Sequence, residues 1–138
     1  MIFVTRREVF SSSHRLFNPK FSESENERVF GKCSNKNGHG HNYTLEVIIA
    51  GEVNIETGYV IDLKLLKEII IENVIQKVDH KNLNLDVDFL NGIIPTSENI
   101  CIGIWSQLID KIPSGKLYSV KLYETENNYV EYKGKENL

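Results

Sequence analysis

Two histidines separated by a single glycine carry the clearest chemistry in this sequence. His39 and His41 lead into residues 43–49, where apolar residues alternate with mostly polar ones, as in a half-buried strand. Because residues i and i+2 of a strand point to the same face, the two imidazoles should project together from one side of a sheet. Zinc binds neutral imidazole nitrogen, and a catalytic zinc usually has three protein ligands and one open position. The pair therefore predicts a metal site that needs a third ligand.

A candidate third ligand lies at the end of the first predicted strand. Residues 2–13 resemble a strand in composition, and its continuation places His14 on the same face as Phe10. A lone histidine after a run of serines is ordinarily a surface residue. Because a His-Gly-His pair is also present, His14 becomes the candidate third metal ligand.

A thiol and two carboxylates supply further chemistry. Cys33 lies six residues before His39, and a thiolate close to a cation is reactive because the cation lowers its pKa. Asp79 and His80 form an acid–base pair, or else a helix C-terminal cap. Glu124, at a strand end, is placed either to accept two hydrogen bonds from an amidine-like heterocycle edge or to be a solvated carboxylate. Thiol, imidazole and carboxylate match the parts of a proton-transfer relay, whereas Cys33 as a fourth zinc ligand would make the site structural.

Length and composition set the broad class. The 138 residues fit one domain, residues 1–138, and 41% hydrophobic with 25% charged residues is ordinary for a globular protein. A net charge of -3 provides no basic field for nucleic acid. No apolar run approaches the roughly 20 residues of a membrane span, and the first residues lack a secretory signal pattern. Two cysteines do not suggest a disulfide framework, so we expect a cytoplasmic protein with free thiols.

Periodicity and capping residues predict two helices. Asp62 is a good N-cap for a helix over residues 63–78, in which apolar residues recur at helical spacing. Thr96 or Ser97 is the predicted N-cap of a second helix, which follows a proline and extends to residue 112. Cys101 lies on the apolar face of this second helix and is interpreted as a core residue.

Alternation predicts four strands, joined in part by hairpins. Residues 18–32 could form a loop or a short helix, and we expect the loop. Residues 79–84 are expected to form a polar turn, and the Asn127–Asn128 pair a two-residue hairpin turn. The predicted class is α+β, with a four-stranded antiparallel sheet, both helices on one face, and the order strand, strand, helix, helix, strand, strand. The predicted strands cover residues 2–13, 39–50, 118–125 and 129–133.

Taken together and in order, these segments closely resemble the motifs of the 6-pyruvoyltetrahydropterin synthase family. The resemblance extends from about Phe3 to Gly134 and implies the T-fold (tunnelling fold) of that family. It also implies trimers that pair into a homohexamer, with active sites at subunit interfaces. The segments are FSSSHRL (10–16), FGKC (30–33), NGHGHNY (37–43), VDHKNL (78–83), PTSEN (95–99), YET (123–125) and YKG (132–134).

The resemblance also implies a role for each candidate residue. His14, His39 and His41 would bind one Zn²⁺ per subunit, and Cys33 would be the thiolate that abstracts a proton. Asp79 and His80 would complete a catalytic relay across a subunit interface. The pterin ring would be anchored by Glu124, with help from Thr96, Ser97 and Glu98.

The implied reaction converts 7,8-dihydroneopterin triphosphate to 6-pyruvoyltetrahydropterin with elimination of triphosphate, as in tetrahydrobiopterin biosynthesis. Cations next to the motifs are candidates for the triphosphate, although each is individually more typical of a solvated surface. These residues are Arg15, Lys32, Lys36 and Lys81. The sequence leaves open whether Mg²⁺ accompanies the triphosphate and which pathway uses the product.

Other interpretations stay open on the sequence alone. One is 6-carboxytetrahydropterin synthase of deazapurine (queuosine) biosynthesis, in which the cysteine usually lies closer to the histidine pair. Five residues separate Cys33 from His39 here, which looks like the spacing of the pyruvoyl enzyme. A further branch has glutamate in place of the cysteine, so Cys33 argues against it. The last alternative is a non-catalytic zinc- or pterin-binding module on the same scaffold.

Overall fold

A five-stranded mixed sheet forms one layer of the computed structural model, which describes residues 1–135. The strand order is β3-β1-β2-β4-β5. Neighbours pair antiparallel, except that β3 runs parallel to β1. The strands are β1 (Ile2–His14), β2 (His39–Gly51), β3 (Lys81–Asn82), β4 (Lys116–Tyr123) and β5 (Tyr129–Tyr132).

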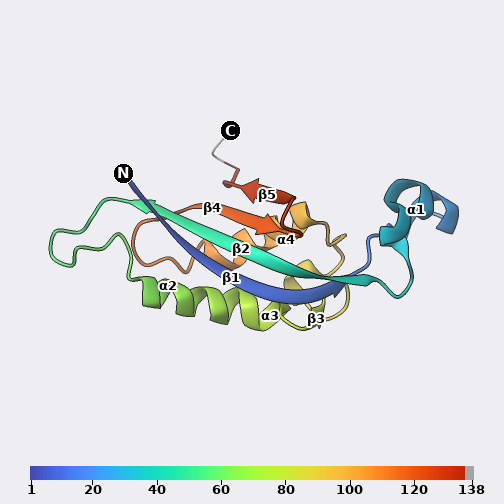
Figure 1. Cartoon of the computed structure of the whole chain (residues 1–138), viewed down its shortest axis with the longest axis horizontal. Coiled ribbons are helices and arrows are strands. Elements are labelled where there is room, and N and C mark those ends of the chain that lie inside the picture. The colour runs from blue at the N-terminus through green and yellow to red at the C-terminus, as the bar shows by residue number, and fades with distance from the viewer. Residues whose placement is uncertain (136–138) are drawn as a thin grey trace.

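The two predicted helices lie on the same face of this sheet (Figure 1). The first is α2 (Leu63–Ile70), which continues through a π-helical turn (Ile71–Ile75) into α3 (Gln76–Val78). The second is α4 (Ser97–Leu108), preceded by a short 3₁₀ turn at Asp88–Leu90. Their predicted caps are confirmed, because Asp62 accepts a hydrogen bond from Lys64 N (2.9 Å) and Thr96 accepts one from Asn99 N (3.2 Å). Among the described residues, no helix is both long and apolar enough to cross a membrane.

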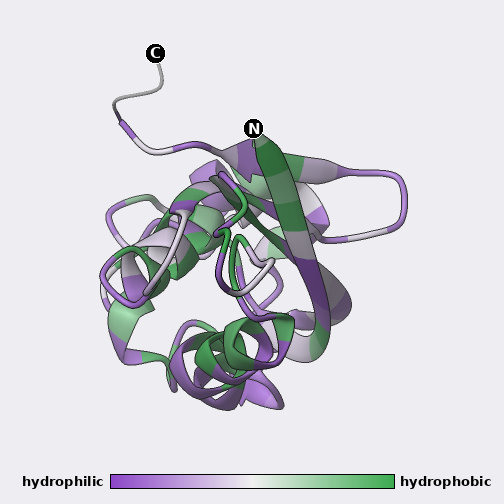
Figure 2. Ribbon diagram, turned by 90° about the vertical axis from the view of Figure 1, so that its left-hand side faces the viewer, coloured by the Kyte–Doolittle hydropathy of each residue, from purple (hydrophilic) through white to green (hydrophobic). Residues whose placement is uncertain are grey.

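The core lies between the sheet and these helices. Alternate residues of β2, from Tyr43 to Ile49, are fully buried on the helix side, as the period of two predicts. The helix that contains α2 and α3 turns its apolar side to the sheet and its hydrophilic side outward (Figure 2). Phe3 and Val9 of β1 are more than half exposed on the opposite face.

The π-helical turn explains an unusual spacing in the buried face of this helix. Leu66, Ile70, Val74 and Val78 are all fully buried although they are spaced at strict intervals of four. In a straight α-helix such a row drifts around the axis, because one turn holds 3.6 residues. A turn with i to i+5 hydrogen bonds holds more residues, so it offsets the drift and keeps all four side chains toward the sheet.

The predicted loop over residues 18–32 is wrong, because it contains a helix. Helix α1 (Glu23–Phe30) is followed by a 3₁₀ turn (Gly31–Ser34) and projects beyond the end of the sheet (Figure 1). Ser22 caps α1 by accepting a hydrogen bond from Glu25 N at 3.1 Å. In α1 only Asn26 is buried, so the sequence carries no apolar periodicity by which this helix could be recognised.

Three further predictions at element ends also need correction. The 79–84 turn contains strand β3, which makes the sheet five-stranded instead of four-stranded and not wholly antiparallel. The hairpin between β4 and β5 is residues 124–128 and not a two-residue turn, since Tyr123 pairs with Tyr129. Within this longer loop, Thr125 accepts a hydrogen bond from Asn127 N at 3.2 Å. Helix α4 ends at Leu108 and not at residue 112.

Candidate metal centre and active site

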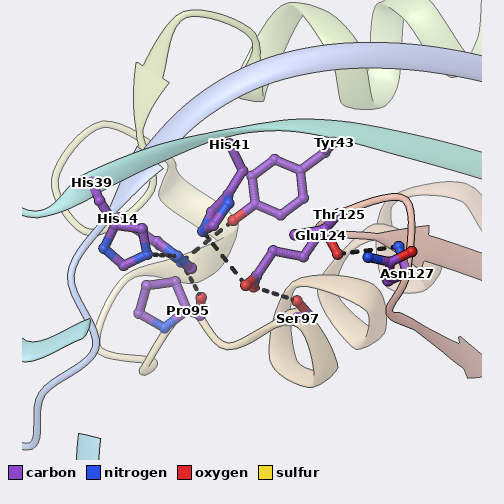
Figure 3. Close-up of polar contacts among 9 residues, drawn as sticks. All are labelled: His14, His39, His41, Tyr43, Pro95, Ser97, Glu124, Thr125 and Asn127. Atoms are coloured by element: carbon purple, nitrogen blue, oxygen red, sulfur yellow. Dashed lines mark hydrogen bonds and ion pairs between the residues drawn. The ribbon is translucent and has the colours of Figure 1, made fainter. Parts of the chain in front are cut away.

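The register of β1 and β2 brings the three predicted metal ligands together. His14 is the pairing partner of His39, and His41 pairs with Ser12, two residues before His14. The ligand nitrogens of the three histidines all lie within 4.8 Å of one another. The prediction that His14, His39 and His41 form one cluster is therefore confirmed, and Figure 3 shows their rings converging.

Gly38 permits the close approach of the two strands at this point. It has a φ of +69°, and a Cβ atom there would lie 2.7 Å from the carbonyl oxygen of His14. Only glycine fits this position without displacing the backbone of either strand. The glycine before His39 thus sets the distance between two of the candidate ligands.

The ring of His14 is oriented by the chain behind it. Its side chain is fully buried, and Nδ1 donates a hydrogen bond to the carbonyl oxygen of Pro95 at 2.8 Å. The hydroxyl of Tyr43 lies 3.4 Å from the same nitrogen, and burial raises the pKa of that phenol, so it stays protonated. With Nδ1 donating to Pro95, the lone pair on Nε2 is directed toward the cluster, as is typical of metal-ligating histidines.

The electrostatics and spacing of the cluster fit a metal ion. Burial lowers the pKa of His14 and of His41 below the ordinary histidine value, which favours the neutral ring that binds metals. The Nε2 atoms of His14 and His39 are 3.2 Å apart. Two nitrogens at the usual zinc distance in a tetrahedral site are separated by about 3.3 Å.

His41 supplies an independent indication of a ligand. Among residues 1–135, its Nε2 is a buried nitrogen that makes no hydrogen bond, and its contact with Glu124 Oε1 is 3.4 Å long. Leaving such a group unpaired costs about 1–3 kcal/mol, and coordination to a metal removes that cost. The three histidines therefore fit zinc with a fourth, open position.

Glu124 borders the cluster on the side of His41. One carboxylate oxygen accepts a hydrogen bond from the Ser97 hydroxyl at 2.8 Å, and the other lies 3.4 Å from His41 Nε2 (Figure 3). Residues 96–98 were expected to assist Glu124, and of these three Ser97 contacts it. Thr96 instead caps α4, and Glu98 is exposed in its first turn.

Cys33 lies on the 3₁₀ turn after α1 and is half-buried. Its carbonyl oxygen accepts a hydrogen bond from Leu16 N at 2.8 Å, which ties the turn to the chain just beyond β1. The thiol does not belong to the group of ligand atoms found among the described residues. The alternative of Cys33 as a fourth ligand in this chain is therefore not supported.

Asp79 and His80 are in side-chain contact at the end of α3. Asp79 Oδ1 accepts a hydrogen bond from Ser11 N at 2.9 Å and lies 3.0 Å from His80 Nδ1. These contacts, the Ser11 N–H foremost, hold the pKa of the Asp79 carboxyl below its usual value. The His80 ring is 83% exposed and is not part of the histidine cluster. It does share with His41 the lining of a surface hollow of about 430 Å³.

The structure adds groups that the sequence interpretation did not assign. The Pro95 carbonyl and the Tyr43 hydroxyl orient His14, and Asn84 hydrogen bonds to the residue that follows His14. Tyr43 shares the parity of His39 and His41, so the strand pattern contained a signal for it. A backbone carbonyl and a loop asparagine leave no such signal in a single sequence.

Comparisons with known proteins point to a single family. The family model described as 6-pyruvoyl tetrahydropterin synthase matches residues 3–135. The 6-pyruvoyl tetrahydrobiopterin synthase of Dictyostelium discoideum is 52% identical over 133 residues, covering 96% of this chain and 96% of the relative. The Homo sapiens protein of the same name is 48% identical over 131 residues, covering 95% of this chain and 90% of the relative.

A solved structure gives the same result at the level of the fold. The 6-pyruvoyl tetrahydropterin synthase of Caenorhabditis elegans superposes with a TM-score of 0.91 at 41% identity, covering 97% of this chain and 96% of that chain. From the match over residues 3–135 and the identity to these relatives, the chain belongs to the 6-pyruvoyl tetrahydropterin synthase family.

Proposed function

We propose that this protein converts 7,8-dihydroneopterin triphosphate to 6-pyruvoyltetrahydropterin and releases triphosphate, as a zinc-dependent carbon–oxygen lyase. The observation that carries the proposal is the cluster of His14, His39 and His41 with Glu124 at its border. It occurs in a chain that is about half identical to relatives named 6-pyruvoyl tetrahydrobiopterin synthase. The reaction is an internal redox shift with elimination, so it requires no nicotinamide or flavin.

The three histidines would hold Zn²⁺, which supplies Lewis-acid polarisation of a substrate oxygen and so acidifies the neighbouring C–H bonds. Glu124 binds the pterin through N–H groups of the heterocycle. Its carboxylate has about four acceptor positions, of which the Ser97 hydroxyl uses one. Because Ser97 holds one oxygen, the carboxylate presents a fixed edge to the ring.

Cys33 is the base that takes a proton from carbon, and Asp79 with His80 forms the second acid–base group. The Ser11 N–H helps to keep Asp79 ionised, and the Asp79 carboxylate orients the His80 imidazole. Among residues 1–135, no hydrogen bond or ion pair joins the Cys33 thiol to Asp79 or His80. In this proposal a second copy of the chain completes the relay, with the active site at the interface of a homohexamer.

The test is mass spectrometry of the pterin products after zinc-loaded protein is incubated with 7,8-dihydroneopterin triphosphate. A 6-pyruvoyl product with free triphosphate supports the proposal. A 6-carboxy or 6-hydroxymethyl product would assign the chain to a sister activity on the same substrate. Absence of turnover from intact, metal-loaded oligomer would contradict the proposal and favour a binding module. Repeating the assay with added Mg²⁺ shows whether the triphosphate requires it.

A further inference from the structure

Residues 79–84 run alongside the end of β1 and extend the sheet toward the metal cluster. His80 N donates to the Ser11 carbonyl at 2.6 Å, and Leu83 N donates to the Ser13 carbonyl at 2.8 Å. Lys81 and Asn82 form the short strand β3 between these contacts. The backbone pairing with β1 ends at Leu83. Beyond it, the side chain of Asn84 makes the hydrogen bonds to the chain that follows β1.

The Asn84 side chain makes two hydrogen bonds to the backbone of Arg15, one as acceptor and one as donor. Its Oδ1 accepts a hydrogen bond from Arg15 N at 2.7 Å, and its Nδ2 donates one to the Arg15 carbonyl at 2.8 Å. A side-chain amide offers a donor and an acceptor together, whereas a carboxylate offers only acceptors. Asn84 thereby reproduces the pairing of a neighbouring strand at the residue that follows His14.

Arg15 and the residue after it are in turn hydrogen bonded to the turn that carries Cys33. Arg15 Nε donates to the Ser34 carbonyl at 2.8 Å, and Leu16 N donates to the Cys33 carbonyl at 2.8 Å. The guanidinium also stacks on the Phe17 ring, with Cζ 3.9 Å from the ring centre. Two adjacent carbonyls of the 3₁₀ turn, those of Cys33 and Ser34, are thus bound by Leu16 and Arg15, and Asn84 holds the backbone of Arg15.

We propose that Asn84 is a positioning residue that acts through Arg15 to fix the Cys33 turn against the end of β1. The catalytic consequence rests on the proposed function of Cys33, whereas the positioning itself is independent of it. When a mutation far from the reacting atoms misplaces a catalytic group by about 1 Å, the rate falls by on the order of a hundredfold. The proposal also gives Arg15 a structural task that differs from binding the substrate triphosphate.

The experiment compares Asn84→Ala, Asn84→Asp and Arg15→Ala with the full-length wild type and with Asn91→Ala, an exposed position in the same connection. Steady-state kinetics separate kcat from KM, and zinc content is measured for each variant. Two readouts do not depend on turnover. One is the hydrogen exchange of the Leu16 amide, and the other is the alkylation rate of Cys33 by iodoacetamide, with the buried Cys101 thiol as internal reference.

We expect Asn84→Ala and Arg15→Ala to lower kcat about tenfold to a hundredfold with KM and zinc content unchanged. The Leu16 amide should exchange faster, and Cys33 should be alkylated about threefold faster, as the turn loosens. Asn84→Asp should behave like Asn84→Ala, because it lacks the donor to the Arg15 carbonyl. Asn91→Ala should match the wild type. The double variant should lose no more than the more impaired single variant, since both act on one connection.

Two results would overturn the inference. One is wild-type Leu16 exchange and Cys33 alkylation in Asn84→Ala. The other is a raised KM with unchanged kcat in Arg15→Ala, which would assign Arg15 to the substrate. If the wild type itself has no turnover, the proposed function fails, but the exchange and alkylation readouts still decide whether Asn84 positions the turn.

Discussion

His14, His39 and His41 occupy one cluster but are fixed in different ways. His14 is held by the Pro95 carbonyl behind its ring, while His39 and His41 are placed by the strand period of β2. Cys33 lies outside this cluster, on a separate turn. At the scale of single residues, the proposed metal binding and the proposed proton transfer therefore involve different side chains and are separable by mutation.

Replacing Cys33 by alanine should abolish turnover without removing the metal. We expect kcat to fall by on the order of 10²–10⁴, the range of a lost general base, while zinc content and the free energy of unfolding stay close to wild type. His39→Ala is the matched variant and should lose zinc together with activity. Zinc is measured by inductively coupled plasma mass spectrometry. Loss of zinc from Cys33→Ala would instead show that the thiol is a ligand.

Asp79 gives a pH-dependent contribution to stability. Because its folded pKa is below the usual value of 3.8, its contribution is present above pH 3.8 and disappears as the pH falls through the folded pKa. Asp79→Asn keeps an acceptor for Ser11 N but removes the charge. Urea unfolding should show the variant less stable than wild type at about pH 6, with the difference reduced at about pH 3. Asp110→Asn, at an exposed position, is the control, and an equal difference at both pH values would contradict the assignment.

The residue types of the site were predictable because each has a recognisable chemistry and spacing. The His-x-His pair and the strand that ends at His14 follow from the period of two, and the cluster confirms them. The partner atoms of these residues were not predictable. Pro95 contributes only a carbonyl and Ser97 reaches Glu124 from another element, and such contacts exist only after the chain has folded.

At the scale of elements, the site depends on how closely the ends of β1 and β2 approach. Gly38 and His14 are in contact through their backbones, and the candidate metal ligands His14 and His39 are paired at the last position of the ladder. A change of one backbone position at this junction therefore alters the distance between two ligands. The requirement for glycine at position 38 is therefore structural and does not depend on contact with a substrate.

Gly38→Ala should reduce both stability and metal affinity. A left-handed conformation costs a non-glycine residue about 1–2 kcal/mol, and here the new Cβ would also meet the His14 carbonyl at 2.7 Å. Gly92→Ala is a close control, because its φ is +74° but nothing lies within 4 Å of the added atom. Urea unfolding and zinc titration should show a larger loss for Gly38→Ala, and a loss of zinc affinity for that variant alone. Equal effects of the two substitutions would mean that the close approach does not matter.

Elements with an apolar face were predictable, and elements without one were not. The helices that became α2 to α3 and α4 have caps and periodic apolar residues, and both are confirmed. Helix α1 buries only Asn26 and β3 has two residues, so neither leaves a pattern in the sequence. The same reason accounts for the change from four predicted strands to five.

At the scale of the whole molecule, the proposed relay means that two copies of the chain contribute residues to each active site. The His80 side chain is 83% exposed, which leaves its ring accessible to a neighbouring subunit. Phe3 and Val9 are also more than half exposed on the face of the sheet opposite the helices. These features agree with an assembled protein, and a complementation experiment tests whether the relay is shared.

Cys33→Ala and His80→Ala should each be inactive alone but should partly restore activity when co-expressed. If one subunit supplies Cys33 and another supplies His80, random mixing of equal amounts yields about one intact site in four. Activity of the purified mixed oligomer should therefore approach a quarter of wild type. Assembling each variant separately and then combining the two is the control, and it should give no recovery. Absence of recovery in the co-expressed sample would place the complete relay within one chain.

The π-helical turn at Ile71–Ile75 has a consequence for the length of the chain. It contains one residue more than a regular helix would need between Leu66 and Val78. Removing one residue there would leave a continuous α-helix with buried positions spaced by three and four, the ordinary amphipathic pattern. The sheet-facing side chains and the Asp79–His80 pair beyond them would then keep their orientation. Chains one residue shorter in this helix are therefore compatible with the same site.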